Sequence, residues 1–102
     1  WFASVSDGLY RQYASKYRVR FGSAPFRLSS MGYDSVLLVL RITRDWPFGT
    51  PFPAARLTSP DGFAGLDGAF RFGPNGLVER AFEVREVRDG AVVVVENAPA
   101  RF

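Results

Sequence analysis

The chain has 102 residues, neither cysteine nor histidine, and a formal net charge of +3 from 13 basic and 10 acidic side chains. The missing thiols and imidazoles exclude a disulfide framework, a thiolate metal site and a histidine-based catalytic triad. The basic side chains are dispersed, with the tightest cluster at Lys16, Arg18 and Arg20, so no nucleic-acid partner is predicted. This length, with a hydrophobic content of 47%, is typical of one globular domain at most.

The first predicted element is an amphipathic helix over about residues 7–20. Ser6-Asp7 is typical of a helix N-cap, and Gly22 followed by Pro25 is typical of a helix end. Between these signals, apolar side chains recur at spacings of three and four residues: Leu9, Tyr10, Tyr13 and Tyr17. Because this spacing places them on one face, the pattern predicts that the face packs against a core.

A second helix is predicted over about residues 31–44, with Ser29-Ser30 as its cap. Its side chains between positions 36 and 42 are apolar nearly all round, which is typical of a helix that is covered on several sides. A chain of 102 residues offers little to cover it. We therefore expect this helix to pack against a partner chain or against sequence missing from this segment.

Residues 45–53 contain three prolines and predict a loop, and a short helix is predicted over residues 54–58. The glycine-rich stretch 61–76 then predicts a tight loop, a short strand and a Pro-Asn-Gly turn. Phe70 and Phe72 lie two positions apart, so they should share one face of that strand.

The tail is predicted to be β-structure. A strand over residues 79–87 should turn at Asp89-Gly90 into a second strand over residues 91–96. The run of valines in the second strand predicts burial on both of its faces. Alternation in the first strand should place two apolar and two charged side chains on opposite faces: Phe82 and Val84 against Glu83 and Arg85.

No enzymatic chemistry is predicted. The acidic side chains of the tail interleave with arginines, a pattern typical of solvated cross-strand ion pairs: Glu79, Glu83 and Glu86 with Arg80 and Arg85. The Asp-Gly spacing of the glycine-rich stretch matches neither a calcium loop nor a phosphate-binding loop. The sequence therefore predicts a protein that is not an enzyme and that uses no cofactor and no metal.

Tyr33 and Ser30 are the candidate ligand-binding residues. Both lie at the start of the second helix, where unpaired backbone N–H groups and a partial positive charge favour a carboxylate. The phenol of Tyr33 would add flat apolar area with one polar group. The alternative interpretation is that Tyr33 only packs at the helix start.

Four segments occur in an order that carries a family resemblance: Trp1-Phe2-Ala3, residues 17–25, Tyr33-Asp34-Ser35-Val36 and residues 61–76. Together they resemble the last part of a type I periplasmic solute-binding protein of the leucine/isoleucine/valine-binding class. The glycine-rich stretch, the Val84-Arg85-Glu86-Val87 strand and the Ala98-Pro99-Ala100-Arg101-Phe102 ending look most like bacterial penicillin-binding protein activators, which are cell-envelope lipoproteins.

The resemblance implies an α/β fold, the C-terminal fragment of a two-lobed receptor, with two main helices followed by a short strand and a β-hairpin. The whole chain, residues 1–102, would be a single segment of that receptor. Residues 1–58 would be the helical part of one lobe near the hinge, and residues 69–102 would be strands that cross towards the other lobe. An aromatic side chain at the Tyr33 position would face the ligand cleft. The implied location is the periplasm or the bacterial cell envelope, with a lipid anchor on a missing N-terminal part.

Three functions stay open at this point. The first is a receptor that binds a small molecule such as an amino acid and delivers it to an ABC permease. The second is a regulator that contacts cell-wall synthases. The third is a freestanding α+β module for protein–protein interaction.

Overall fold

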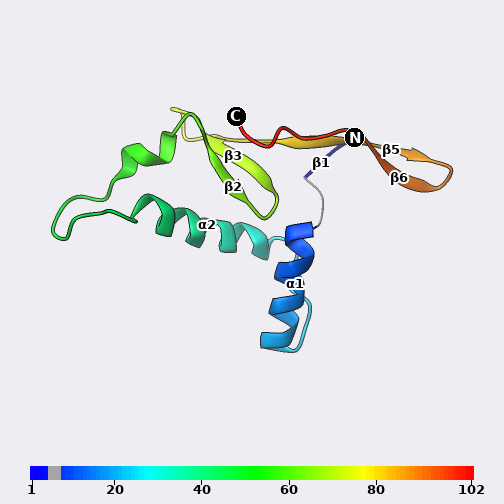
Figure 1. The fold of residues 1–102 in the computed structure, drawn as a ribbon, viewed down its shortest axis with the longest axis horizontal. Helices are drawn as coiled ribbons and strands as arrows, with labels where there is room; N and C mark the ends of the chain where they lie inside the picture. Colours follow the sequence, from blue (N-terminus) through cyan, green and yellow to red (C-terminus); the bar gives the residue numbers. More distant parts are fainter. Residues whose placement is uncertain (5–7) are drawn as a thin grey trace.

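A computed structural model describes residues 1–4 and 8–102 of the chain, and the predicted Ser6-Asp7 cap lies outside these residues. Figure 1 shows the arrangement of the helices and strands. In chain order they are β1 (Phe2–Ser4), α1 (Gly8–Phe21), α2 (Ser29–Ile42), the 3-10 helix η1 (Ala54–Thr58), β2 (Phe63–Gly65), β3 (Gly68–Phe72), β4 (Val78–Arg80), β5 (Phe82–Arg88) and β6 (Ala91–Glu96).

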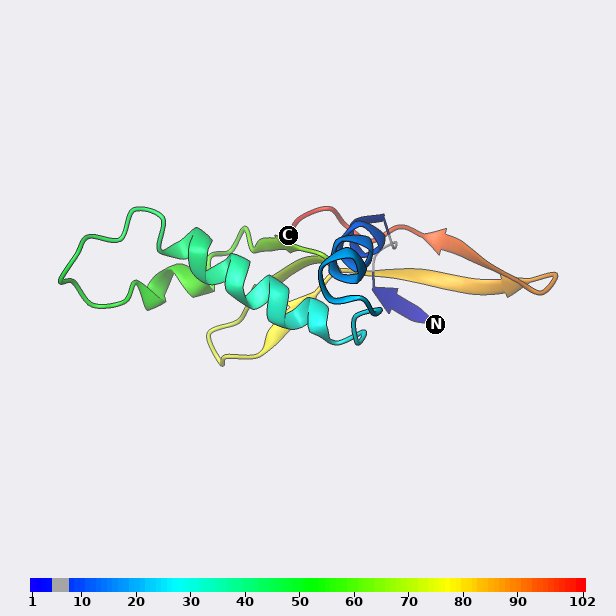
Figure 2. The same ribbon diagram turned by 90° about the horizontal axis from the view of Figure 1, so that it is seen from below.

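The strands of the described residues form two antiparallel sheets of three strands each. One sheet has the order β2-β3-β4, and the other has the order β1-β5-β6. Helix α2 and η1 lie along the first sheet, whereas the β5-β6 hairpin extends away from both helices (Figure 1, Figure 2). Strand β1 was not predicted, and its pairing of Phe2 with Val84 joins the first residues of the chain to the tail.

The core lies between α2, η1 and the β2-β3-β4 sheet. Ile42 of α2 packs with Phe63 of β2 and Phe70 of β3, and these two phenylalanines lie opposite each other in the sheet register. Partly buried hydrophobic side chains surround them: Leu38, Leu57 and Phe72. Arg56 of η1 donates to the carbonyl of Ile42 at 2.8 Å, which satisfies an acceptor that the end of α2 leaves open.

The first predicted helix is confirmed, but the packing of its apolar face is not. Gly22 ends α1 with φ of 76° and donates its N–H to the carbonyl of Arg18 at 2.8 Å. No residue of α1 is buried, so the prediction of a core-packed face is wrong. The reason is that α1 projects away from the two sheets and leaves its aromatic face only partly covered (Figure 1).

The second predicted helix is also confirmed, and its predicted serine cap is wrong. The residue at the N-cap position of α2 is Leu28, and no side chain there makes a capping hydrogen bond. Ser29 and Ser30 are the first residues of the helix. The Ser29 hydroxyl donates to the carbonyl of Phe26 at 2.6 Å, and the Ser30 hydroxyl lies 2.6 Å from Oδ2 of Asp67. Both serines therefore lie inside the helix and not at its N-cap position, which Leu28 occupies.

The glycine-rich stretch contains a strand that the sequence did not predict. Strand β2 turns at Leu66-Asp67 and pairs with the predicted strand, now β3, in which Phe70 and Phe72 share a face with ring centroids 6.0 Å apart. The predicted turn that follows is confirmed: Gly76 has φ of 77°, and Gly73 donates to the carbonyl of Leu77 at 2.9 Å.

The strand predicted over residues 79–87 is two strands. Ala81 lies buried between β4 and β5 and donates its N–H to the carbonyl of Ala69 at 2.9 Å. The chain passes from one sheet to the other at Ala81. As a result, the charged face of the predicted strand is more buried at Glu83 than the apolar face is at Phe82. Glu83 is buried and ion-paired with Arg85, whereas Phe82 is exposed.

The expectation that β6 is buried on both faces is also wrong. Val92, Val94 and Val95 are all exposed. Strand β6 is the edge of a sheet that no helix of the described residues covers (Figure 1, Figure 2). Of the three glutamates that were predicted to form cross-strand ion pairs, Glu79 does so, but its partner is Arg71 of β3, at 2.7 Å.

The predicted hairpin at Asp89-Gly90 is confirmed. Arg88 lies opposite Ala91, and the two turn residues have φ of 49° and 77°. Two positive values in a two-residue loop are those of a type I′ turn, whose twist matches the flanking strands.

Replacing Gly90 by valine should lower the free energy of unfolding by roughly 1 kcal/mol or more, because a β-branched residue resists positive φ. The measurement is urea denaturation, with Arg88→Val as the control because Arg88 lies on β5 with an exposed side chain. Equal stability of the two variants would show that the turn does not require this conformation.

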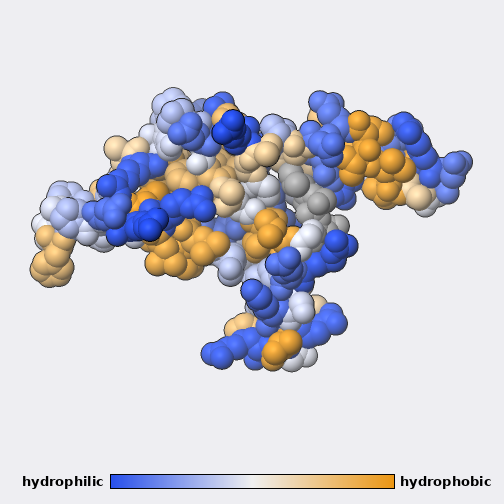
Figure 3. Space-filling view, in the orientation of Figure 1, coloured by the Kyte–Doolittle hydropathy of each residue, from blue (hydrophilic) through white to orange (hydrophobic). Residues whose placement is uncertain are grey.

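The chain exposes much more surface than a compact monomer of its size. Its radius of gyration is 16.2 Å, against about 13 Å for a compact domain of ~100 residues. Its accessible surface is 7564 Å², whereas the size scaling of monomeric proteins gives roughly 5,800 Å² for this mass. Apolar side chains gather on the surface of α2 and again on the β5-β6 hairpin (Figure 3). Val36 and Leu40 of α2 are 62% and 61% exposed, so the described chain leaves this apolar helix face uncovered, as the sequence suggested.

Candidate functional site

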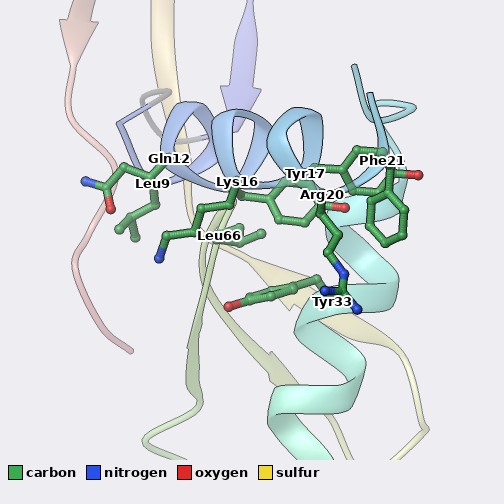
Figure 4. A pocket seen from close by; sticks show the side chains of 9 residues that line it. Leu9, Gln12, Lys16, Tyr17, Arg20, Phe21, Tyr33 and Leu66 are labelled. Carbon is green, nitrogen blue, oxygen red and sulfur yellow. The ribbon is translucent and has the colours of Figure 1, made fainter. Parts of the chain in front are cut away.

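A pocket between α1, the start of α2 and the β2-β3 turn contains the candidate residue Tyr33. Its volume is about 360 Å³, which lies within the range of small-molecule sites. Leu66 of the β2-β3 turn closes one side (Figure 4). Four aromatic side chains line it: Tyr13, Tyr17, Phe21 and Tyr33.

Tyr13 joins the two helices that form the pocket. Its ring centroid lies 5.2 Å from that of Tyr33, and its hydroxyl donates to Ser29 Oγ at 2.8 Å. Along α1 the rings continue, with centroids 6.0 Å apart for Tyr13 and Tyr17 and 4.5 Å apart for Tyr17 and Phe21. Three residues of the stripe that the sequence suggested as core, Leu9, Tyr13 and Tyr17, therefore line a pocket instead.

The polar side chains of this pocket also come from α1. Gln12, Lys16 and Arg20 follow one another at intervals of four residues, which places them on one side of the helix. Figure 4 shows Lys16 and Arg20 extending from α1 towards the side where Tyr33 lies. From the sequence, Lys16 and Arg20 were only members of the tightest cluster of otherwise dispersed basic residues, and no site was predicted there. Their spacing relative to Tyr13 and Tyr17 was the signal that would have placed them here.

Ser30 is not in this pocket. It is 1% exposed, and its hydroxyl lies 2.6 Å from Oδ2 of Asp67. Arg27 donates to both carboxylate oxygens of Asp67, at 2.6 and 3.2 Å. The carboxylate that lies beside the start of α2 is therefore that of the protein's own β2-β3 turn. Tyr33 and Ser30 therefore lie on the same helical turn and face different surroundings.

Asp34 makes a second link between α2 and the β2-β3 turn. Its Oδ1 accepts the backbone N–H of Leu66 at 2.9 Å, and the residue is 3% exposed. Asp34 Oδ2 and Nη1 of Arg80 are buried atoms without a hydrogen-bond partner among the described residues. A Cβ atom on Gly65 would lie 2.8 Å from Asp34 Cγ, so the carboxyl group packs directly on this glycine.

The pKa values of the two carboxyl groups are shifted in opposite directions. Burial raises the pKa of Asp34 above its ordinary value, and the nearby charge of Asp67 raises it further. Burial also acts to raise the pKa of Asp67, but hydrogen bonds from Arg27 and Ser30 outweigh it, so that pKa lies below the ordinary value. At neutral pH Asp67 is therefore held as the ion, and Asp34 is the group that gains most from a proton.

Stability should consequently respond to pH through Asp34. A carboxyl group with a raised pKa in the folded state favours folding below its unfolded pKa, and this contribution is lost as pH rises through the raised value. Relative to Asp34→Asn, the natural protein should gain stability as the pH falls from about 7 towards about 4. Urea denaturation of both proteins across this range measures the effect. Asp67 is common to both proteins, and its contribution is lost only as the pH falls from its unfolded pKa through its lowered folded pKa, so a constant difference would contradict the prediction.

Other kinds of site are not found within residues 1–4 and 8–102. No group of three or more potential metal-ligating side chains occurs there. None of the helices described there has the length and apolar character needed to span a membrane.

Comparison with models of known protein families finds no match, and neither does comparison with curated protein sequences. Among solved structures, the chain superposes on the crystal structure of a protein described as a branched-chain amino acid ABC transporter from Rhodospirillum rubrum. The TM-score is 0.69 over 92% of this chain, and the sequence identity is 23%. The match covers 29% of that protein, so this chain spans less than a third of its length.

The likeness establishes the fold. Two helices and antiparallel strands form a mixed α/β arrangement that matches a fragment of a type I periplasmic-binding-protein structure. The α/β fold class predicted from the sequence is confirmed. The extended shape and the exposed face of α2 agree with a chain that corresponds to one part of a larger fold.

Proposed function

We propose that this chain is a ligand-binding segment of a solute-binding receptor of the branched-chain amino acid-binding class. The observation that carries the proposal is the structural match over 92% of the chain. The pocket at Tyr33 supports it, because aromatic walls with a few polar groups are typical of small-molecule sites. The proposed role is binding of a small carboxylate such as an amino acid, and not catalysis.

In this proposal, residues 1–58 contribute the helical part of one lobe near the hinge, and residues 69–102 contribute strands that cross towards the other lobe. The pairing of β1 with β5 adds Phe2–Ser4 to the crossing strands. Tyr33 contacts the ligand, and Ser30 supports the start of α2 through Asp67. The receptor would act in the periplasm or the bacterial cell envelope and deliver its ligand to an ABC permease.

A second candidate function is docking of another protein on the exposed face of α2. Val36 and Leu40 support it, because contiguous exposed apolar surface marks interaction sites. A lipid-anchored regulator of cell-wall synthases, as in penicillin-binding protein activators, and a freestanding interaction module are both forms of this function. Neighbouring permease genes would favour the receptor, and neighbouring cell-wall genes would favour the regulator.

Replacing Tyr33 by alanine in the full-length gene product should weaken ligand binding by about 1–3 kcal/mol, the scale of losing a buried aromatic contact and its hydrogen bond. Calorimetric titration with a panel of amino acids and small organic acids measures this. Tyr10→Ala is the matched control, because Tyr10 lies on α1 under the guanidinium of Arg27 and does not line the pocket. Unchanged affinity together with a lower melting temperature would show that Tyr33 only packs.

A further inference from the structure

Three consecutive residues of the β2-β3 turn are held against α2. Asp34 packs on Gly65, where an added Cβ atom would lie 2.8 Å from the Asp34 Cγ. Oδ1 of Asp34 also accepts the N–H of Leu66 at 2.9 Å. Asp67 accepts a hydrogen bond from the buried hydroxyl of Ser30 at 2.6 Å. These contacts fix the position of the turn relative to the start of α2.

Leu66 is the residue through which this turn reaches the pocket at Tyr33. Among the described residues, the rest of the pocket lining comes from α1 and from Tyr33 itself. Figure 4 shows Leu66 and Tyr33 on the same side of α1. These two side chains are therefore the walls of the pocket that α1 does not supply.

Asp34 joins these two walls directly. It follows Tyr33 in the chain, and its carboxyl oxygen holds the backbone N–H of Leu66. This hydrogen bond acts on the backbone of the same residue whose side chain lines the pocket. A movement of the turn that breaks the bond must therefore also move the Leu66 side chain relative to Tyr33.

The two carboxyl groups that hold the turn contribute differently. Asp67 is ion-paired and accepts three side-chain hydrogen bonds, so it supplies much of the strength of the attachment. Asp34 is 3% exposed, and its Oδ2 has no hydrogen-bond partner among the described residues. A buried carboxyl group with one unpaired oxygen is a weak source of stability. Its bond to the Leu66 N–H is better explained by the position that it gives to Leu66.

We infer that Asp34 is a positioning residue of the Tyr33 pocket: it holds Leu66 at the distance from Tyr33 that ligand binding requires. The inference rests on the proposed function and names a residue on which the affinity of that site depends. Asp34 does not itself line the pocket, so it acts through Leu66. A wall that is already in place spares the ligand the free-energy cost of ordering it.

Calorimetric titration of the full-length gene product tests the inference. The titrants are the panel of amino acids and small organic acids, led by L-leucine, L-phenylalanine and succinate, and the variants are compared on the one that the natural protein binds most tightly. Asp34→Ala removes the acceptor for the Leu66 N–H and should weaken binding by about three- to tenfold, the scale of ordering one side chain on binding. Leu66→Ala removes the positioned wall and should weaken binding at least as much. Asp34→Asn keeps a carbonyl oxygen as acceptor and should restore binding to within about twofold of the natural protein.

Leu57→Ala is the matched control for a loss of stability. Leu57 lies on η1, packs against the core and does not line the pocket, so its truncation should lower stability and leave the affinity unchanged. Amide hydrogen exchange adds a measurement without ligand. Asp34→Ala should speed the exchange of the Leu66 N–H relative to that of the Ala81 N–H, which is bonded to a strand carbonyl, whereas Leu57→Ala should not.

Three results would overturn the inference. The first is a folded Asp34→Ala, as judged by circular dichroism, whose affinity is unchanged. The second is a Leu57→Ala that weakens binding as much as Asp34→Ala, because the loss would then follow from stability alone. The third is an equal loss in Asp34→Asn and Asp34→Ala, because the acceptor would then not be what matters.

If Asp34→Ala does not fold, Leu66→Ala decides, and unchanged affinity in that variant overturns the inference. In all of these cases the natural protein still binds its titrant, so the solute-binding function stands. If the natural protein binds no member of the panel, the solute-binding function falls and the inference falls with it.

Discussion

Replacing Gly65 by valine should lower the free energy of unfolding by about 2–4 kcal/mol, combining overpacking with damage to a buried hydrogen bond. A Cβ atom at this position would lie 2.8 Å from Asp34 Cγ and 3.1 Å from a ring carbon of Phe70. Asp34 cannot move away without losing the N–H of Leu66, and Phe70 belongs to the core. The side chain therefore has no space on either side.

Urea denaturation measures the effect, with Gly32→Ala as the matched control. Nothing lies within 4 Å of a Cβ atom built on Gly32, which is in the interior of α2. Alanine there should raise stability by up to about 1 kcal/mol, because glycine is a poor helix former. If Gly65→Val is as stable as the natural protein, the contact between α2 and the β2-β3 turn is not as close as the structure shows.

Replacing Asp67 by alanine should lower the free energy of unfolding by about 2–3 kcal/mol. The carboxylate is buried and accepts hydrogen bonds from Arg27 and from the buried hydroxyl of Ser30. Its removal takes the nearest acceptor from the Ser30 hydroxyl and breaks the ion pair between the β2-β3 turn and Arg27, which lies just before α2. The side chain of Arg27 is 45% exposed, so water compensates part of its loss and keeps the effect below that of a fully buried pair.

The control for this variant is Asp61→Ala, because Asp61 is exposed and lies in the turn before β2. Its substitution should change stability by less than about 0.5 kcal/mol. A second variant, Asp67→Asn, keeps the shape of the side chain and should fall between the two. Equal losses for Asp61→Ala and Asp67→Ala would show that the buried network contributes no stability.

The sequence predicted helix ends and turns correctly where the residues that specify them are neighbours in the chain. Gly22 and Gly90 both have the positive φ that the turn and helix-end patterns require, and both end their elements where expected. Phe70 and Phe72 share one face of β3, as the two-residue period of a strand predicts. These features depend on a few neighbouring residues, so a short pattern contains the information.

Errors occurred where distant segments compete for the same residues. The strand predicted over residues 79–87 divides at Ala81. The part before Ala81, β4, pairs with β3, whereas the first residues of β5 pair with β1. Glu83 is buried in consequence, although its charge and its alternation with Arg85 indicated a solvated face. A pattern of alternating side chains cannot show which sheet the strand will join.

The candidate site was only partly accessible from the sequence. Tyr33 was selected for its place at a helix start, and the structure puts it in a pocket whose other walls come from α1. Ser30 was selected for the same reason and lies in a different, buried network with Asp67. Ser30 and Tyr33 are three residues apart, so their side chains point about 60° apart around the helix axis. Ser30 therefore contacts Asp67 of the β2-β3 turn, whereas Tyr33 contacts Tyr13 of α1.

By itself, the sequence determined the two helices, the β5-β6 hairpin, the mixed α/β class and the apolar face of α2 that the described chain leaves exposed. Spacing and turn chemistry specify such features within one element. Only the tertiary structure decided that Asp34 and Asp67 attach α2 to the β2-β3 turn, and that Lys16 and Arg20 lie in the same pocket as Tyr33. The two ends of the Arg27–Asp67 ion pair are 40 residues apart along the chain. The burial of such groups and their distances from one another exist only once the two helices and the turn have packed together.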